Sequence, residues 1–412
     1  LLRPGALAIF IMMVLAVTLV THAYAAPQPP TPVDAPGIAP LDQVDTATMP
    51  SIDNAALIAE ERQRAGPGVA PRFAQQIPVS LTPAHSGTWE TLPDGGQLWR
   101  LRIQSPGAVS LNLGFTSYHM PPGGQLLLYT PDHAVVRGPF TAADNESHGQ
   151  LWTPILDGDE VVVEATLPAG VATQLRLELG AVNHGFVAFG QAPLSGACNV
   201  DVVCSAANGL PQVDAWRNQI RAVAAISAGG DIFCSGFLIN NTANDRRPYF
   251  ITAYHCGSTE ARAPSLVVYW NYQNTTCREP GSPASGGPGD GSLSQFNTGS
   301  VLRAAYFPSD FTLVELDDPI DPGYNVFWAG WDARPGNPTS ATGIHHPNGE
   351  EKRISFEDDP LSTTSYLGAS SPGDGSHLRV SDWNLGTTEG GSSGSPLFNQ
   401  EGQIVGQLHG GE

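Results

Sequence analysis

The sequence predicts an all-β protein with two β units in one chain of 412 residues. Charged residues make up only 14 % of the chain, and 46 glycines and 36 prolines are typical of short strands joined by turns. From about residue 80 to 190, apolar and polar residues alternate with a period of two. From about residue 198, short apolar runs are again separated by loops.

The first unit has the pattern of an antiparallel β-sandwich. Apolar and polar residues alternate at 99–104, 109–116 and 175–179, so each strand presents one apolar face and one polar face. Pro-Gly and Asp-Gly pairs separate these runs and predict turns. This half contains no cysteine and no evident catalytic group.

The N-terminus has the layout of a secretory signal over residues 1–25. Arg3 provides the positive flank, residues 6–20 are apolar, and the segment closes on a small-x-small motif. We therefore expect a secreted protein, and no other stretch is long and apolar enough to span a membrane. Residues 26–49 predict a disordered linker, and a short helix capped by Asp53 is expected to end near Arg64.

The net charge of −20 excludes two classes of partner. Lys and Arg total 19 against 39 Asp and Glu, and no basic run occurs, so we expect neither nucleic acid nor an anionic membrane as a partner. The acidity is accounted for by solubility alone.

The cysteine count is odd, and in a secreted chain cysteines are expected to form disulfides. A free thiol and a partner beyond residue 412 both account for the fifth cysteine. The chain stops after an apolar, strand-like run, which favours a C-terminally incomplete sequence. All five lie in the second half: Cys198, Cys204, Cys234, Cys256 and Cys277.

Three segments supply the members of a nucleophile, base and orienter set. His255 follows the apolar run 249–253, Asp310 precedes the apolar run 311–316, and Ser393 lies in a Gly-Ser loop. A serine hydroxyl becomes nucleophilic when an imidazole takes its proton, and a carboxylate fixes the tautomer of that imidazole. In the order His, Asp, Ser, the segments predict a serine protease.

Ser393 is the predicted nucleophile among three serines, the others being Ser392 and Ser395. Only Ser393 has a glycine two positions before it, Gly391, and another directly after it, Gly394. A tight turn of this kind presents the hydroxyl, and the backbone N–H groups of Gly391 and Ser393 would form the oxyanion hole.

Each segment also has a purely structural interpretation. The serine could belong to a surface loop, although the strand-like run 396–398 that follows argues against this. Asp310 could be a turn residue. The pair His345 and His346 is interpreted as structural, because a metal site would need a third ligand at a sensible spacing and none is visible. We expect no metal and no cofactor.

The motifs resemble those of the chymotrypsin-fold serine proteases, namely Thr-Ala-x-His-Cys at 252–256, Asp-Phe-Thr-Leu-Val-Glu-Leu at 310–316 and Gly-x-Ser-Gly-x-Pro at 391–396. Residues 195–412 more specifically resemble the bacterial lysyl endopeptidases. By position, residues 26–194 are then a prosegment that assists folding and blocks the active site, with a carbohydrate- or surface-binding module as the alternative. The supporting stretches are 198–204, 240–246, 267–274, 327–332, 351–355 and 406–411.

The resemblance implies two six-stranded β-barrels with the catalytic residues in the cleft between them. It implies the disulfides Cys204–Cys277 and Cys234–Cys256, and it pairs Cys198 with a cysteine beyond residue 412.

The resemblance also implies a substrate-binding strand and an aromatic stack. Leu408, His409 and Gly410 would pair with substrate backbone, and Gly410 would leave the mouth of the specificity pocket open. His409 would stack on Tyr366, which stands where a Trp is usual. The Asp on which the family's lysine preference depends would lie beyond residue 412.

Two observations bear on specificity. Lys352 is the only lysine, which would spare a lysine-cutting enzyme from cutting itself, although an Arg-biased composition explains it equally well. No Lys or Arg lies between residues 177 and 198, so release from the prosegment by a cut after lysine is not available at that junction. Another protease would mature the enzyme, or its preference differs.

The sequence therefore predicts a monomeric, secreted serine endopeptidase, made as a precursor, that hydrolyses polypeptides through an acyl-enzyme. Lysine is the expected residue on the acyl side of the cut, with Arg or a broader preference second. The alternative is an inactive homologue that acts as a secreted binding module. Its expected partners are polypeptide substrates and its own prosegment.

Overall fold

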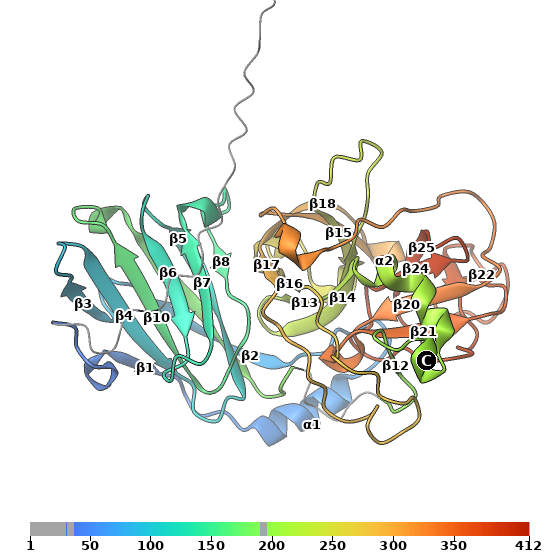
Figure 1. The fold of residues 1–412 in the computed structure, drawn as a ribbon, viewed down its shortest axis with the longest axis horizontal. Coiled ribbons are helices and arrows are strands. Elements are labelled where there is room, and N and C mark those ends of the chain that lie inside the picture. The colour runs from blue at the N-terminus through green and yellow to red at the C-terminus, as the bar shows by residue number, and fades with distance from the viewer. Residues whose placement is uncertain (1–29, 31–36, 190–195, 412) are drawn as a thin grey trace, which may run out of the picture.

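A computed structural model describes residues 30, 37–189 and 196–411. The predicted signal segment 1–25 lies outside the described residues. Two β units lie side by side, and helix α1 (Asn54–Arg64) runs below the junction between them (Figure 1). None of the helices in the described part is long and apolar enough to cross a membrane.

The first unit is the predicted sandwich. One sheet has the strand order β1-β4-β10-β6-β7, with β3 added on β4; the other has the order β2-β11-β5-β8, with β9 added on β5. All pairs are antiparallel except β1 with β4. The bounds are β1 Thr46–Thr48, β2 Ala74–Leu81, β3 Thr88–Thr91, β4 Gln97–Gln104, β5 Ser110–His119, β6 Gln125–Tyr129, β7 Val136–Thr141, β8 Leu151–Trp152, β9 Leu156–Asp157, β10 Glu160–Leu167 and β11 Arg176–Gly185.

The alternation in β4 produces the expected core, with one exception. Leu101 and Ile103 are buried between the two sheets. Arg100, expected on a polar face, is only 2 % exposed. Its Nη2 donates to Ala39 O at 2.6 Å and pairs with Glu90 at 2.5 Å, which offsets the cost of burying the charge.

The predicted helix is present, whereas the predicted linker differs from the structure. Asp53 caps α1 by accepting a hydrogen bond from Ala56 N at 3.1 Å. Residues 37–49 are ordered, because Val44 and Met49 are buried and β1 joins the edge of a sheet. Apolar residues within a Pro-rich stretch were sufficient to fix it on the sandwich.

The second unit contains two curled sheets, in agreement with the predicted two-barrel protease fold. The described residues give orders of β17-β16-β13-β14-β15-β19-β18 and β12-β21-β20-β24-β25, each around its own apolar cluster, plus the pair β22-β23. The bounds are β12 Val200–Asp201, β13 Val223–Ala228, β14 Ile232–Leu238, β15 Tyr249–Ala253, β16 Val267–Tyr269, β17 Phe296–Thr298, β18 Ser300–Tyr306, β19 Phe311–Leu316, β20 Ala341–His345, β21 Arg353–Glu357, β22 Ser362–Thr364, β23 His377–Arg379, β24 Pro396–Asn399 and β25 Ile404–Gln407.

Two disulfides hold this unit. Cys204 bonds to Cys277 across 73 residues, and Cys234 on β14 bonds to Cys256, directly after His255. Cys198 is exposed and forms no disulfide with the other described cysteines.

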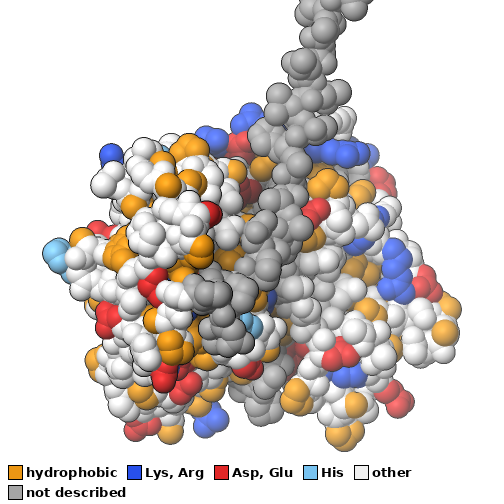
Figure 2. All heavy atoms as spheres, turned by 60° about the vertical axis from the view of Figure 1, so that its left-hand side comes forward, with side chains coloured by type: hydrophobic (Ala, Val, Ile, Leu, Met, Phe, Trp, Pro, Cys, Tyr) orange, Lys and Arg blue, Asp and Glu red, His pale blue; other side chains and the backbone are white. Residues whose placement is uncertain are grey.

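The two units share an apolar cluster and a group of acids. Phe73 and Phe189 from the first unit pack with Phe233 and Tyr269 of the second. On the face shown in Figure 2, acidic, basic and hydrophobic side chains are interspersed.

Acidic side chains line a small cleft at the junction between the two units. Asp144 and Glu146 come from the first unit, and Asp317 and Asp318 come from the second. His148 Nε2 lies 2.8 Å from Asp317 Oδ2. Burial and the nearby carboxylates of Asp144, Glu146 and Asp317 raise the pKa of Asp318 from 3.8 to about 7.

This raised pKa predicts that Asp318 destabilises the fold as pH rises. Between about pH 4 and 7 the folded chain holds a proton on Asp318 that the unfolded chain has lost, so the free energy of unfolding falls with pH. One such group contributes a slope of up to about 1.4 kcal/mol per pH unit. Asp318→Asn removes this titration and should flatten the fall, measured by urea unfolding at several pH values.

The exposed Asp358 provides the matched control. Asp358→Asn should leave the pH dependence of unfolding as it is in the parent chain. Equal slopes for the parent and Asp318→Asn would contradict the prediction.

Candidate active site

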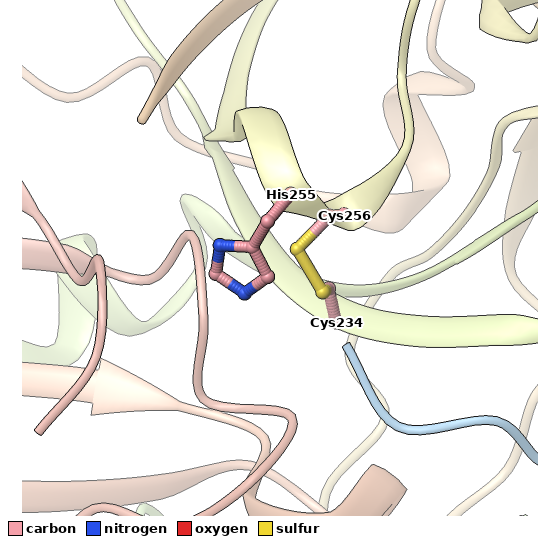
Figure 3. A group of neighbouring side chains, drawn as sticks. All are labelled: Cys234, His255 and Cys256. Atoms are coloured by element: carbon pink, nitrogen blue, oxygen red, sulfur yellow. A yellow bond between two sulfur atoms is a disulfide. The ribbon is translucent and has the colours of Figure 1, made fainter. Parts of the chain in front are cut away.

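His255 is held at the end of a buried strand. Strand β15 delivers the chain into a single 3₁₀ turn, Tyr254–Cys256, which Gly257 ends with a φ of 82°. Cys256 is tied to Cys234 on the neighbouring strand, so the turn is covalently fixed beside the imidazole (Figure 3).

Asp310 contacts His255 through both of its carboxylate oxygens. Its Oδ2 lies 2.6 Å from His255 Nδ1, and its Oδ1 accepts from the His255 backbone N–H at 2.8 Å. Asp310 is only 2 % exposed. Its φ of 53° is a left-handed conformation that Asp tolerates. With a proton on Nδ1, the His255 Nε2 lone pair is left to act as a base.

The Ser393 loop packs closely against the chain that leads to His255. Gly391 and Gly394 have φ values of 84° and 81°. A methyl group on Gly394 would lie 2.5 Å from Thr252 Oγ1 and 2.6 Å from Ala253 N, next to the turn that carries His255. Only glycine permits this packing. The carbonyl of Ser393 accepts from Ser235 N at 2.9 Å.

The structure distinguishes among the candidate serines. Ser392 is fully buried, and its Oγ lies 2.8 Å from His345 Nδ1. Ser393 keeps 8 % of its surface exposed and lies beside the disulfide, since Cys256 Sγ is 3.9 Å from Ser393 O. In the described residues the amides of Gly391 and Ser393 donate no hydrogen bond to protein, which leaves both available to an oxyanion.

His409 lies beside His255 and Asp310, where the family resemblance led us to expect it. Its ring stacks on Tyr366 with centroids 3.6 Å apart and planes 7° apart. His409 Nε2 is 3.8 Å from Asp310 Oδ2, and its ring is 6.2 Å from that of His255. Leu408, which precedes it, accepts from Gly394 N at 2.8 Å, so this strand lies directly beside the serine loop.

A second histidine, His377, was missed by the sequence reasoning. Its Nε2 lies 3.0 Å from His409 Nδ1, and its Nδ1 lies 2.7 Å from Ser376 Oγ. Tyr366 covers both imidazoles, at 5.3 Å from the His377 ring. His377 belongs to a Gly- and Ser-rich stretch without a recognisable motif, and only the fold brings it to His409.

The donor groups near His255 are poor metal ligands. Cys234 and Cys256 share a disulfide and so lack the thiolates that zinc requires, although they adjoin the imidazole (Figure 3). Asp310 is already engaged with both nitrogen donors of His255. The pair His345 and His346 is fully buried, and burial lowers the pKa of His345 to about 3, which keeps it neutral.

The fold and the site together define a class of protein, a serine endopeptidase with a chymotrypsin-type β fold. Residues 192–412 match the family model of the lysyl endopeptidase C-terminal domain, and residues 46–186 match that of the lysyl endopeptidase N-terminal domain. The chain belongs to the lysyl endopeptidase family.

One relative agrees with this assignment. A lysyl endopeptidase of Pseudomonas aeruginosa is 30 % identical over 346 residues, which cover 78 % of this chain and 70 % of that relative. Among solved structures, the active form of the Rv3671c protease from M. tuberculosis has 15 % identity and a TM-score of 0.27, covering 50 % of this chain and 75 % of its own. Deg5 has 15 % identity and a TM-score of 0.30, covering 48 % and 82 %.

The contact between His377 and His409 predicts a role in positioning. His377→Phe keeps a ring under Tyr366 but loses the hydrogen bond to His409, and a lost hydrogen bond corresponds to roughly a tenfold fall in kcat/KM. The loss should appear mainly in kcat and should shift the acidic limb of the pH–rate profile. His377→Gln, whose amide can replace Nε2, should restore most of it. Equal activity of the Phe and Gln variants would contradict the positioning role.

Proposed function

We propose that this chain is the precursor of a secreted serine endopeptidase that forms an acyl-enzyme and cuts after lysine. Ser393 attacks the carbonyl carbon of the scissile bond, and His255 takes the serine proton and returns it to the leaving amine. Asp310 fixes the tautomer of His255 and stabilises the imidazolium that forms. The amides of Gly391 and Ser393 bind the oxyanion.

The observation that carries this proposal is the double contact of Asp310 with His255. A carboxylate that accepts from Nδ1 at 2.6 Å and from the backbone N–H at 2.8 Å fixes both the tautomer and the ring orientation. The carboxylate is buried, so its charge is poorly screened by water and acts strongly on the imidazole. An Asp–His pair with a purely structural role would not have to lie beside the Ser393 loop, in which Gly391 and Gly394 both have a left-handed backbone conformation.

Lysine specificity is supported by the family and by the state of the single lysine. Lys352 is fully buried, and its Nζ donates to Ile220 O at 2.9 Å. A protease that cuts after lysine therefore finds no accessible lysine on its own folded chain. A preference for Arg, or a broader one, is the competing hypothesis.

The arrangement of the chain supports a secreted precursor. The two disulfides suit an oxidising compartment. We assign residues 1–25 to a signal peptide, 26–194 to the prosegment and 195–412 to the protease, which acts on polypeptides as a monomer. The apolar cluster shared by both units is what a prosegment that assists folding would provide.

Ser393→Ala tests the nucleophile. Loss of the attacking hydroxyl should reduce kcat by at least about 10⁴-fold and abolish labelling by a fluorophosphonate probe. Ser392→Ala is the matched control, since Ser392 is a buried partner of His345 and should still allow labelling at Ser393. Labelling of an intact Ser393→Ala protein, or none in the parent protease, would reject the assignment and favour a binding module.

A digest of denatured proteins tests the specificity. Mass spectrometry of all products from the matured protease should show cuts confined to the carboxyl side of lysine. Cuts after Arg or other residues would retain the serine protease and reject the lysine preference.

A further inference from the structure

The two amides of the proposed oxyanion hole belong to peptide groups that are held in different ways. Each peptide group is trans, so its C=O points away from its N–H, and whatever binds the carbonyl fixes the direction of the amide. The Ser392 carbonyl, which shares a peptide group with the Ser393 amide, accepts from Ser395 N at 3.0 Å. This bond lies within the serine loop, so the Ser393 amide is fixed by its own turn.

The Gly391 amide depends on a different part of the chain. The carbonyl of its peptide group, Gly390 O, accepts from Asn348 N at 2.5 Å, and Asn348 lies in the 3₁₀ turn Pro347–Gly349 after β20. Gly390 is exposed, and Gly391 has a φ of 84°. A peptide group between two glycines has no side chain on either side to restrict its rotation. The contact with Asn348 therefore sets the direction of the Gly391 N–H.

Asn348 has a backbone conformation that few residues adopt. Its φ is 51° and its ψ is 27°, in the left-handed region where Asn is enriched. The residue before this turn is also fixed, since His346 N donates to Ser235 Oγ at 2.9 Å. Ser235 Oγ in turn donates to Gly391 O at 2.9 Å. This part of the chain thus holds two successive carbonyls of the serine loop, those of Gly390 and Gly391.

The side chain of Asn348 binds the serine loop a second time. Its Nδ2 donates to Glu389 Oε2 at 2.6 Å. The other oxygen of this carboxylate, Oε1, accepts from Gly196 N at 2.7 Å and from Asn199 Nδ2 at 2.6 Å. A carboxylate forms stronger hydrogen bonds than a neutral carbonyl does, so these three bonds fix the residue that directly precedes Gly390.

We propose that Asn348 is a positioning residue that keeps the Gly391 N–H directed at the carbonyl oxygen of the substrate. Its backbone N–H holds the Gly390 carbonyl, and its side chain holds Glu389. Rotation of the peptide group between the two glycines would replace the N–H by a C=O, which repels an oxyanion. This inference rests on the proposed function and specifies what keeps one of its two oxyanion donors in place.

Asn348→Asp tests the side-chain contact and leaves the backbone N–H in place. The new carboxylate faces that of Glu389 across the lost hydrogen bond, and like charges at that distance repel each other. In the matured protease kcat should fall by about 10- to 100-fold, because the Gly391 donor is displaced, while KM should change little. The inhibition constant of a peptide aldehyde, whose adduct carries the oxyanion, should rise by the same factor.

Glu389→Gln added to Asn348→Asp should restore most of the activity. The introduced amide can donate to the carboxylate at position 348, and its oxygen can still accept from Gly196 N. The contact is kept with donor and acceptor exchanged. Asn325→Asp is the matched control, because Asn325 is exposed, has the same φ of 51° and ends a different turn, Pro322–Tyr324. It should leave kcat and the inhibition constant unchanged.

Hydrogen exchange provides a readout that does not depend on catalysis. In the full chain carrying Ser393→Ala, Asn348→Asp should speed amide exchange of the peptide 389–395 roughly tenfold, as expected for one lost hydrogen bond. Adding Glu389→Gln should slow the exchange again, and mass spectrometry of peptic fragments measures both effects. Equal exchange with and without Asn348→Asp would overturn the inference.

The outcomes separate this inference from the proposed function. In an active protease, an unchanged kcat for Asn348→Asp, or a loss that Glu389→Gln does not restore, would overturn the positioning role. A rise in KM with unchanged aldehyde binding would overturn it as well. If the parent protease neither cuts peptides nor reacts with a fluorophosphonate, the proposed function fails, and the exchange rates alone decide whether Asn348 holds the serine loop.

Discussion

The site depends on the two hydrogen bonds between Asp310 and His255. An acid at the start of a core strand is costly to bury unless donors meet both oxygens, and His255 supplies one donor from its ring and one from its backbone. The same contacts fix the turn relative to β19. The same two hydrogen bonds stabilise the buried carboxylate and orient the imidazole that is the proposed base.

This arrangement joins both sheets of the protease unit. His255 and Asp310 come from the seven-stranded sheet, whereas Ser393 precedes β24 of the five-stranded sheet. Gly394 closes the gap, because its lack of a side chain lets the serine loop contact the end of β15. The disulfide between Cys234 and Cys256 adds a covalent tie next to the point where Arg72 of the first unit bridges to Ile232. In the proposed mechanism a small displacement of either sheet would move His255 out of reach of Ser393.

The local motifs were sufficient to predict the fold class, and the structure places Asp310 against His255. Gly391 and Gly394 stand where left-handed backbone is needed, and such positions are visible in a sequence. Contacts that depend on tertiary packing were not visible. His377 meets His409 only through the folding of a Gly-rich loop, and Arg100 is buried because the chain near Ala39 covers it.

The proposed catalytic groups are arranged while the first unit packs against the second. The hydrogen bonds between His255 and Asp310 and the glycine turns around Ser393 are present in a chain in which the two units are packed together. If residues 26–194 are a prosegment, as proposed, their removal would not have to assemble these groups. Among the described residues His255 Nε2 has no hydrogen-bond partner, so the protein does not engage the lone pair that the proposed mechanism uses.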